Sequence, residues 1–493
     1  MSYTRKVAYN TAAQLIGKII GTGVSLITTA ALFRYFGVVG IGKYTTVFAF
    51  VGFFSVFADF GLQWTLIREL TLQRDQNKVF SNVFAFRLLL ALVIHALAFA
   101  LVWFFKYPID VKLGVGVISV AWFFTTINST LVGVFLTNYR LDLTVSAEVV
   151  GRLVILAAVL LMTKARLSFN FVMSAYLVGN FVNFTANLAL VRRYIKVALD
   201  FDWKYWRRIF SQALPIGIVL VFGFIYYKID SLMLSILKGM TDVGIYGAAY
   251  KLLEVLQTVP AMFLGAAFPL ITRYATSGDE RVRSAFQKQF DFLMLLAVPI
   301  VAGTFLLASP IISFIAGSRG AEFLDASTIT FAGHAITSVT CLKILIFSVG
   351  VAFLSNLYSY MIVSLGRQRS MVAPVIGFAL LNVVLNLILI PRWSYLGAAA
   401  ATFLTELVVF TSYLFITRRF IRLPLTLKSF AKIVVAGLVM SGAVFLLQKN
   451  NINLFVNILA AAVVYAGAVL ALRAVTLEQI GEILRIKSDA RRN

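Results

Sequence analysis

The chain has 493 residues, of which 60% are hydrophobic and only 13% are charged. Soluble domains carry nearer 25% charged residues, so this composition excludes a soluble protein and predicts one that lies largely in a membrane. The formal net charge of +24 does not indicate nucleic-acid binding, because the basic residues are spread over many short loops and form no continuous patch. The single cysteine, Cys341, excludes disulfide and CxxC chemistry.

The N-terminal segment begins like a signal peptide, with Arg5 and Lys6 among its first residues. The apolar run that follows reaches about Tyr35, which is too long for the core of a signal peptide and predicts an uncleaved first helix. Runs of roughly twenty apolar residues are long enough to cross a bilayer. About fourteen such spans follow one another, near residues 12–36, 42–62, 82–105, 114–137, 147–164, 167–190, 211–236, 243–271, 290–315, 338–363, 371–391, 396–417, 428–447 and 452–473.

A basic linker at residues 191–209 divides these spans into two halves. It mixes Lys and Arg with aromatic residues such as Trp203 and Trp206, a composition that suits the lipid headgroup region. We therefore predict an all-α polytopic membrane protein. Its predicted parts are an N-terminal six-helix lobe at 1–190, a cytoplasmic linker at 191–209, a second six-helix lobe at 210–420, and two additional helices with a cytoplasmic tail at 421–493.

The loop charges predict how the chain is oriented. If the N-terminus lies inside, the inner segments hold about 28 Lys and Arg residues and the outer loops about 10, as the positive-inside rule requires. A missed or an extra helix would scramble this alternation, so both termini are predicted to be cytoplasmic. A short internal echo, Val39-Gly40-Ile41 against Val243-Gly244-Ile245, opens the second helix of each half and is expected for parallel repeats.

The stretch from 210 to 273 holds Lys228, Asp230, Lys251 and Glu254 inside apolar spans. An ionisable group at such a depth costs about 2.5–3.5 kcal/mol on insertion scales, so these residues are candidates for function. Asp230 and Lys251 lie about equally far from the turn between the two spans, which predicts similar depths. Lys251 and Glu254 share a helix face, whereas Lys228 and Asp230 point in nearly opposite directions. A structural ion pair that helps two helices insert together is an equally open interpretation.

Enzyme chemistry is disfavoured by the predicted outer loops, which are short. Their acids, with one histidine, show no paired-carboxylate or metal-ligand spacing: Asp110, Asp242, Glu322, Asp325 and His334. The chain has no phosphate-binding loop of the Gly-x-x-x-x-Gly-Lys-Ser/Thr type. We therefore expect no enzyme, no cofactor and no metal, although a membrane glycosyltransferase or ligase remains the alternative class.

Three ordered groups of residues carry a family resemblance. They are 31–37, 40–44, 59–61 and 68–69; then Leu214-Pro215, 227–230, 243–246, Ala249, Glu254, Pro260 and Pro269; and then 365–368, Asn382, 385–386, Ile390-Pro391 and 397–399. In order and spacing they resemble the polysaccharide and oligosaccharide (O-antigen-type) flippases of the multidrug/oligosaccharidyl-lipid/polysaccharide (MOP) exporter superfamily. The match extends over nearly the whole chain and is loosest after about Phe420.

This resemblance implies two six-helix lobes around a central cavity, two flanking C-terminal helices, and alternating access. It also implies the substrate, an undecaprenyl-pyrophosphate-linked oligosaccharide moved from the cytoplasmic to the external leaflet. A pyrophosphate that crosses a bilayer needs cationic partners in a wet cavity. We expect phosphate or headgroup contacts from Lys18, Arg87, Lys228 and Lys251, while snorkelling to the headgroups is the competing interpretation for Lys18 and Arg87, as it is for Arg152 and Lys343 outside this set.

Coupling and hinge residues are also expected. Asp230, Glu254 and Glu406 are candidates for coupling or for ion pairs, and a neutral, hydrogen-bonded Glu406 is the favoured alternative. Asp59 suits a helix cap or a loop tie, and His95 a hydrogen-bonded core position. Proline kinks helices, so Pro215, Pro260 and Pro299 are the expected hinges, which leaves the first lobe stiffer than the second.

The sequence therefore predicts a flippase for lipid-linked oligosaccharides in a bacterial or archaeal plasma membrane. Its expected partners are membrane lipid, the lipid-linked glycan and other membrane proteins of polysaccharide assembly, and not nucleic acid. The alternatives within transport are a flippase for a lipid-linked peptidoglycan precursor and an ion-coupled drug exporter of the same superfamily. Deep lysines favour an anionic substrate over a cationic drug.

Overall fold

The computed structural model describes residues 3–73, 75–276, 281–423, 425–450 and 452–474. Within these residues the chain is helical apart from loops and one short β-ribbon, and eleven helical segments are long and apolar enough to cross a membrane. This confirms the predicted all-α polytopic class. The count of fourteen helices and the cytoplasmic termini stay predictions, and the predicted tail beyond residue 474 lies outside the described residues.

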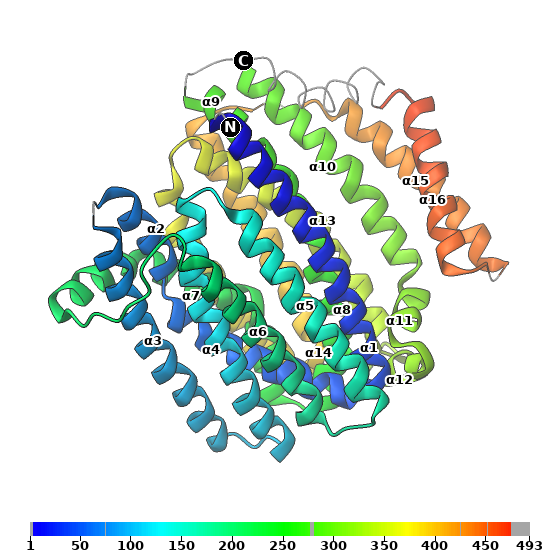
Figure 1. Cartoon of the computed structure of the whole chain (residues 1–493). Helices are drawn as coiled ribbons and strands as arrows, with labels where there is room; N and C mark the ends of the chain where they lie inside the picture. Colours follow the sequence, from blue (N-terminus) through cyan, green and yellow to red (C-terminus); the bar gives the residue numbers. More distant parts are fainter. Residues whose placement is uncertain (1–2, 74, 277–280, 424, 451, 475–493) are drawn as a thin grey trace. The chain divides into compact units, whose positions relative to one another are not determined.

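The chain divides into two compact units, which are described separately. Figure 1 draws their helices, coloured along the sequence. Unit 1 comprises Met1–Ala248, Ile315–Ala335 and Val375–Ala398, and unit 2 comprises Ala249–Phe314, Ile336–Pro374 and Ala399–Asn493. The lobe boundaries drawn from the sequence stay predictions.

Unit 1 contains α1 (Tyr3–Asp59), α2 (Leu62–Leu72), α3 (Gln76–Leu101), η1 (Val102–Phe104), α4 (Ile109–Thr137), α5 (Leu141–Lys164), α6 (Phe169–Val191), α7 (Trp203–Leu237), the start of α8 (Met240–Leu256), η2 (Gly317–Arg319), α12 (Gly320–Asp325), β1 (Thr330–Phe331), β2 (His334–Ala335) and part of α14 (Val372–Phe420). Unit 2 contains the remainder of α8 and α14, with α9 (Thr258–Thr276), α10 (Arg281–Leu306), α11 (Ala308–Ala316), α13 (Ser338–Ser364), η3 (Gln368–Met371), α15 (Leu427–Lys449) and α16 (Leu454–Ala471).

Two of the long helices are kinked between two predicted spans. In α1 the kink is at Gly37, whose φ of 64° is accessible to glycine at little cost. In α14 it is at Ser394, with φ 45°, three residues after Pro391. Proline lacks the N–H that continues a helix, so Pro391 weakens α14 just before this kink. The predicted spans 12–36 and 42–62, and 371–391 and 396–417, therefore lie on either side of these kinks.

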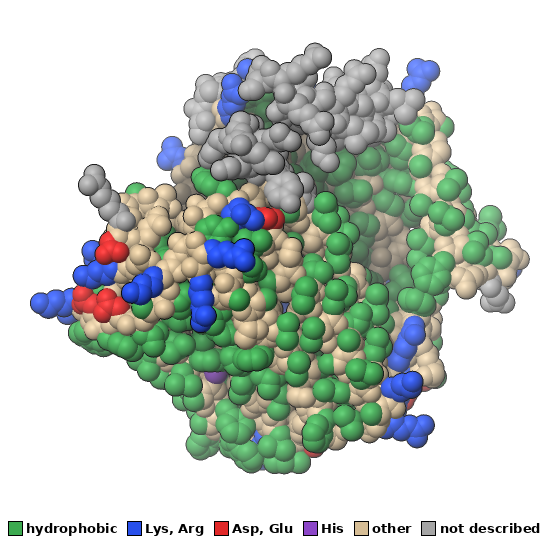
Figure 2. Space-filling view, viewed as in Figure 1, with side chains coloured by type: hydrophobic (Ala, Val, Ile, Leu, Met, Phe, Trp, Pro, Cys, Tyr) green, Lys and Arg blue, Asp and Glu red, His purple; other side chains and the backbone are tan. Residues whose placement is uncertain are grey.

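The linker between α6 and α7 is held against α3 by Asn82. The Asn82 amide donates to Asp200 Oδ2 at 2.7 Å and accepts from the Asp202 backbone N–H at 3.0 Å. The Trp206 indole N–H donates to the Asn82 backbone carbonyl at 3.0 Å. Figure 2 shows charged side chains gathered over α2 and the linker, while hydrophobic side chains line the helices on the face drawn. This distribution suits helices in lipid with the linker at the headgroups.

A glycine crossing joins α1 to α8 within unit 1. A Cβ built on Gly42 would lie 1.8 Å from the Met240 carbonyl oxygen, and one on Gly244 would lie 1.9 Å from the Val38 carbonyl oxygen. Only residues without a side chain allow two backbones to approach so closely, as at small-residue crossings of membrane helices. The residues of this crossing lie in or next to the repeated segments 39–41 and 243–245. The repeated segments therefore lie where α1 and α8 pack together.

Unit 2 packs α9, α10, α13, α15 and α16 around aromatic contacts. The rings of Phe263 and Phe292 stack with centroids 4.0 Å apart. The Tyr465 hydroxyl in α16 donates to the Leu295 carbonyl at 2.9 Å, and the Gln448 amide in α15 donates to the Leu306 carbonyl at 2.8 Å. These bonds tie the last two described helices to α10.

Candidate functional site

Arg87 is the most deeply buried of the predicted substrate-binding cations. It lies eleven residues after the start of α3 at Gln76, or about 16 Å along the helix axis. Its side chain is only 1% exposed, and Nη2 donates to Asp59 Oδ1 at the end of α1. Because Arg87 is buried against Asp59, its side chain does not snorkel to the headgroups. Asp59 joins the end of α1 to α3, as expected for a loop tie. Within the described residues, Arg87 Nε and Nη1 are buried and have no hydrogen-bond partner.

Asp230 and Lys228 differ in burial and in their contacts, while their predicted opposite directions stay a prediction. Asp230 is 3% exposed, accepts from the Ser231 backbone N–H at 2.7 Å, and accepts from the Tyr246 hydroxyl of α8. Lys228 is half-buried, with Nζ 5.5 Å from the centre of the Tyr227 ring. Asp230 is therefore fixed in the contact between α7 and α8, whereas the Lys228 ammonium lies beside an aromatic face.

Lys251 and Glu254 form an ion pair within α8, in unit 2. Their side chains are 33% and 21% exposed, and Lys251 Nζ lies 3.0 Å from Glu254 Oε2. This pairing confirms that the two residues share a helix face. A role of the pair in binding and the approach of Lys251 to Asp230 stay predictions.

The other predicted charges differ in burial. Lys18 is exposed on α1, and Glu406 is buried in α14, 4% exposed and within electrostatic range of Tyr413. Arg152 ties α5 to α1, because its Nη1 donates to the Gly21 carbonyl and to Ser25 Oγ, each at 2.9 Å. Lys343 Nζ lies 5.2 Å from the centre of the Phe305 ring.

The predicted hinges occupy two different helical contexts. Pro215 and Pro299 lie inside the continuous helices α7 and α10. Pro260 is the third residue of α9 and follows the break at Gln257 that separates α8 from α9. Proline at 260 has no N–H for the Leu256 carbonyl, which accounts for a break at this point. Bending at these sites stays a prediction.

His95 is satisfied by hydrogen bonds within unit 1, as predicted. Its Nδ1 lies 2.8 Å from the Ala91 carbonyl and its Nε2 lies 3.1 Å from Ser55 Oγ. In the described part of the chain no group of three or more His, Cys, Asp or Glu side chains is close enough together to hold a metal ion.

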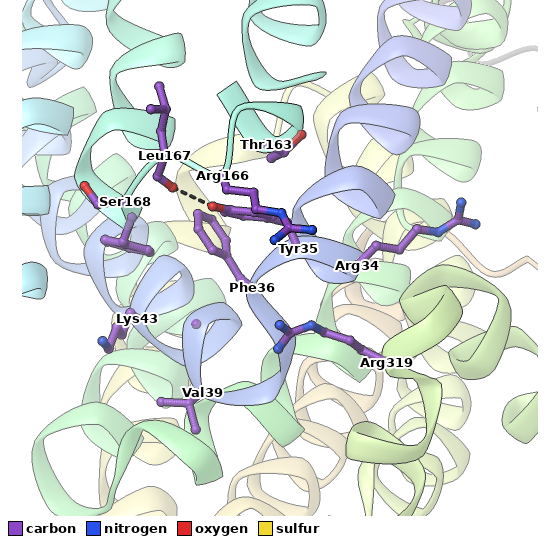
Figure 3. Close-up of a pocket in the computed structure, with 12 residues that line it drawn as sticks. Arg34, Tyr35, Phe36, Val39, Lys43, Thr163, Arg166, Leu167, Ser168 and Arg319 are labelled. Carbon is purple, nitrogen blue, oxygen red and sulfur yellow. Dashed lines mark hydrogen bonds between the residues drawn. The ribbon is translucent and has the colours of Figure 1, made fainter. Parts of the chain in front are cut away.

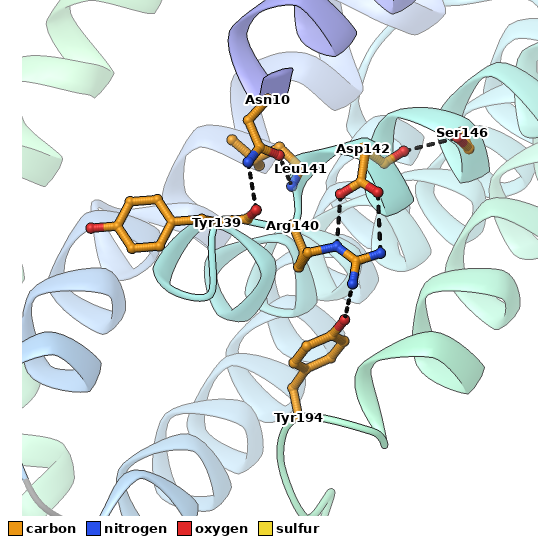
Figure 4. Close-up of polar contacts among 7 residues, drawn as sticks. All are labelled: Asn10, Tyr139, Arg140, Leu141, Asp142, Ser146 and Tyr194. Carbon is orange, nitrogen blue, oxygen red and sulfur yellow. Dashed lines mark hydrogen bonds and ion pairs between the residues drawn. The ribbon is translucent and has the colours of Figure 1, made fainter. Parts of the chain in front are cut away.

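Two polar sites were not singled out by the sequence. At the predicted inner end of unit 1, Asn10 of α1 clamps the α4–α5 turn: its amide donates to the Tyr139 carbonyl at 2.5 Å and accepts from the Leu141 N–H at 2.9 Å (Figure 4). Arg140 binds both Asp142 oxygens, at 3.0 and 3.2 Å, and donates to the Tyr194 hydroxyl at 3.0 Å. The paired Arg140-x-Asp142 spacing was the available signal.

The second site is a pocket of about 740 Å³ in unit 2, where α14 ends near η3. Arg418 and Arg419 line it together with Ser370, Ser412 and Phe415. These two arginines entered the sequence argument only as orientation charges. Their side-by-side position, next to the predicted inner end of a span, was the signal that the pocket would be cationic.

Comparison with known proteins identifies related chains. Residues 4–275 match the family model described as "Polysaccharide biosynthesis protein", and residues 215–388 match the MatE model. A curated relative, "Probable low-salt glycan biosynthesis flippase Agl15" of Haloferax volcanii, is 21% identical over 437 residues, which is 87% of each chain.

Solved structures share the fold. "Lipid II flippase MurJ, inward closed conformation" superposes with a TM-score of 0.76 at 15% identity, over 94% of this chain and 98% of that chain. A structure described as "Inward-facing conformation of a multidrug resistance MATE family transporter of the MOP superfamily" gives a TM-score of 0.64 at 13% identity, over 81% and 95%. At these identities the likeness concerns the fold alone.

Proposed function

This chain belongs to the polysaccharide biosynthesis protein family, and on that premise we propose that it is a flippase for lipid-linked oligosaccharides. The family match confirms the resemblance found in the sequence. In this proposal, a pyrophosphate-linked oligosaccharide on an undecaprenyl or similar lipid moves from the cytoplasmic to the external leaflet by alternating access. The curated relative is itself named as a glycan biosynthesis flippase, which supports the substrate class.

The observation that carries the proposal is the side chain of Arg87. A charged group so deep in a membrane protein is retained at a cost that function commonly explains. Asp59 neutralises part of that charge, yet two guanidinium nitrogens remain buried without a partner in the described residues. Buried donors rarely stay unsatisfied, so a ligand or water is expected to fill these positions. A phosphate oxygen is an acceptor that either of these two nitrogens can bind.

The three lysines would act as further contacts along the path of the phosphate. Lys18 and Lys228 belong to unit 1, and Lys251 to unit 2. Lysine is a mobile point charge that holds a phosphate without a fixed geometry, which suits a headgroup that moves. Glu254 would compete with the substrate for Lys251, because the two side chains already form an ion pair. Such competition would favour release over permanent binding.

The test is reconstitution of the full chain into liposomes with a lipid-pyrophosphate glycan that carries a fluorophore on its sugar. A membrane-impermeant reductant added outside the liposomes quenches only the fluorophores in the outer leaflet. Translocation is therefore measured as the further loss of fluorescence when lipid from the inner leaflet reaches the outer one. Arg87→Gln, Lys228→Ala and Lys251→Ala should each slow flipping at least tenfold, because each removes a charged phosphate contact. Lys78→Ala is the matched control, since Lys78 is an exposed cation on the same helix as Arg87. Normal flipping by all three variants would refute the site.

The rival functions have separate outcomes in the same liposomes. Transport of a cationic dye, with no movement of the lipid-pyrophosphate glycan, would indicate a drug exporter. A strong preference for a peptidoglycan-precursor lipid would indicate a precursor flippase. Transfer of sugar between lipids without translocation would indicate a glycosyltransferase and would overturn the transport reading altogether.

A further inference from the structure

A pocket of about 710 Å³ lies at the predicted outer end of unit 1, away from the transport residues named above. Three segments form it: α1 around its kink, the turn between α5 and α6, and η2 (Figure 3). Four cations line it, namely Arg34, Lys43, Arg166 and Arg319. Figure 3 shows the guanidinium groups of Arg166 and Arg319 directed toward the same space beside Tyr35 and Phe36, while Arg34 extends away from it.

The acids near this pocket neutralise only part of its charge. Lys43 pairs with Asp110 at 2.5 Å, and Arg319 pairs with Glu322 at 3.2 Å. The second Glu322 oxygen accepts from the Val38 backbone N–H at 3.2 Å, so this carboxylate is shared with the kink of α1. Lys43, Arg166 and Arg319 thus face two carboxylates, while Arg34 extends away from the pocket.

Arg166 is the cation without a partner in this pocket. Among the described residues its side chain makes no hydrogen bond or ion pair. Its backbone is nevertheless tightly held: the Arg166 N–H donates to the Thr163 carbonyl, and the Leu167 N–H donates to the Met162 carbonyl, each at 3.1 Å. The Tyr35 hydroxyl fixes the same turn by donating to the Leu167 carbonyl at 2.6 Å.

The backbone conformation at Arg166 argues that its side chain is kept for a reason. The two hydrogen bonds define the helix-ending motif in which glycine is the preferred residue, because the chain turns left-handed there. Arg166 has a φ of 53°, a region that side chains with a Cβ disfavour. The Arg166 side chain is exposed, so water can solvate it. The turn contributes a fixed position for this guanidinium at the edge of the pocket.

The N-terminus of a helix lies at the same pocket, with its Val38 N–H already bound to Glu322. The second segment of α1 begins after Gly37, and Val39 and Gly40 of its first turn line the pocket. Helix N-termini carry partial positive charge and expose backbone N–H groups, so they favour anions. Guanidinium groups and a helix N-terminus together recognise the oxygens of phosphate better than an isolated carboxylate, because phosphate offers more acceptors and more charge.

We propose that this pocket, built on Arg166 and Arg319, is an anion site for a phosphate group presented at the outer face. Two sources share that chemistry: the headgroup of an anionic phospholipid, and a soluble or glycan-linked phosphate. The pocket is larger than a phosphate ion requires, which leaves room for the group attached to it. The site does not depend on the proposed translocation.

The test uses the full chain in phosphatidylcholine nanodiscs with ³²P-labelled inorganic pyrophosphate as the probe. The parent should bind the probe saturably, and Arg166→Gln and Arg319→Gln should each weaken binding about tenfold or more. Lys112→Gln is the control at the same predicted face, because Lys112 lies over Trp103 and does not line the pocket. Because pyrophosphate can also bind the proposed transport site, the same comparison is repeated in a Lys228→Ala background. There Arg166→Gln should still weaken the remaining saturable binding, which separates the pocket from the transport site.

Arg166→Gly distinguishes binding from structure. It should lose probe binding while its melting temperature stays unchanged or rises, because glycine relieves the left-handed backbone. To identify the source of the phosphate, phosphatidylglycerol is added to the nanodiscs. A rise in the melting temperature of the parent that Arg166→Gln lacks identifies a lipid headgroup. Probe binding without such a rise identifies a soluble or glycan-linked phosphate. Neither response in the parent, or equal losses in Lys112→Gln, would overturn the proposal.

Discussion

Replacing Asp59 by alanine should destabilise the protein far more than replacing an exposed acid on the neighbouring helix. The variant leaves the Arg87 guanidinium, 1% exposed, without the carboxylate that now accepts from Nη2. Removal of one partner of a buried ion pair costs about 3–5 kcal/mol, because the remaining charge stays desolvated and unpaired. Two other nitrogens of Arg87 are already unsatisfied in the described residues, so the side chain has no second acceptor to turn to.

The assay is unfolding of the purified full chain by denaturing detergent, followed for parent and variants under the same conditions. Asp75→Ala is the matched control. Asp75 caps the start of α3, where its side chain accepts from the Lys78 N–H at 3.1 Å, and it is exposed. Loss of a helix cap costs about 1 kcal/mol. The Asp59→Ala/Arg87→Met double variant should recover most of the loss, since it removes the charge as well.

Two results would contradict this reasoning. The first is an Asp59→Ala variant within about 1 kcal/mol of the parent, since a fully desolvated charge cannot lose its partner so cheaply. The second is a double variant no more stable than Asp59→Ala alone, which would indicate that Asp59 acts on the end of α1 and not on Arg87.

Three further predictions test the packing that positions the site. Gly42→Leu should prevent assembly of a stable protein, because any side chain there meets the backbone of α8. Gly23→Ala is the control, since Gly23 has open space around it, and only this variant should run normally in size-exclusion chromatography. Tyr246→Phe should cost about 1–3 kcal/mol in detergent unfolding, because it removes a donor from the buried carboxylate of Asp230. Asn82→Leu should make the linker at 191–209 markedly more sensitive to limited proteolysis, because that side chain holds it through two hydrogen bonds.

The sequence predicted features that depend on local periodicity. The spacing of Lys251 and Glu254 placed them on one helix face, and they form an ion pair at 3.0 Å. The apolar surroundings of His95 predicted a satisfied core histidine, and its two ring nitrogens have partners. Such features follow from the 3.6-residue repeat and from the cost of burying a polar group, both of which are readable along the chain.

Long-range pairing could not be read in this way. Snorkelling was a competing interpretation for Arg87 because the predicted span begins near residue 82, but α3 begins at Gln76 and its arginine is buried against Asp59. Likewise, no pattern links Val38 to Glu322, which lie 284 residues apart and meet at the kink of α1. The tertiary arrangement decides which acid pairs with which base, and helix periodicity carries no information about that pairing.

The present contacts of each charged side chain decide how readily it can change partners during transport. Asp230 is almost fully buried and accepts from a backbone N–H and from the Tyr246 hydroxyl, which together hold the carboxylate in place. This favours a structural role for Asp230 over a coupling role. The Lys251–Glu254 pair is partly exposed, and exposed pairs are held by little net free energy. The more exposed Lys251–Glu254 pair is therefore a better candidate for exchange with a phosphate than the buried Asp230.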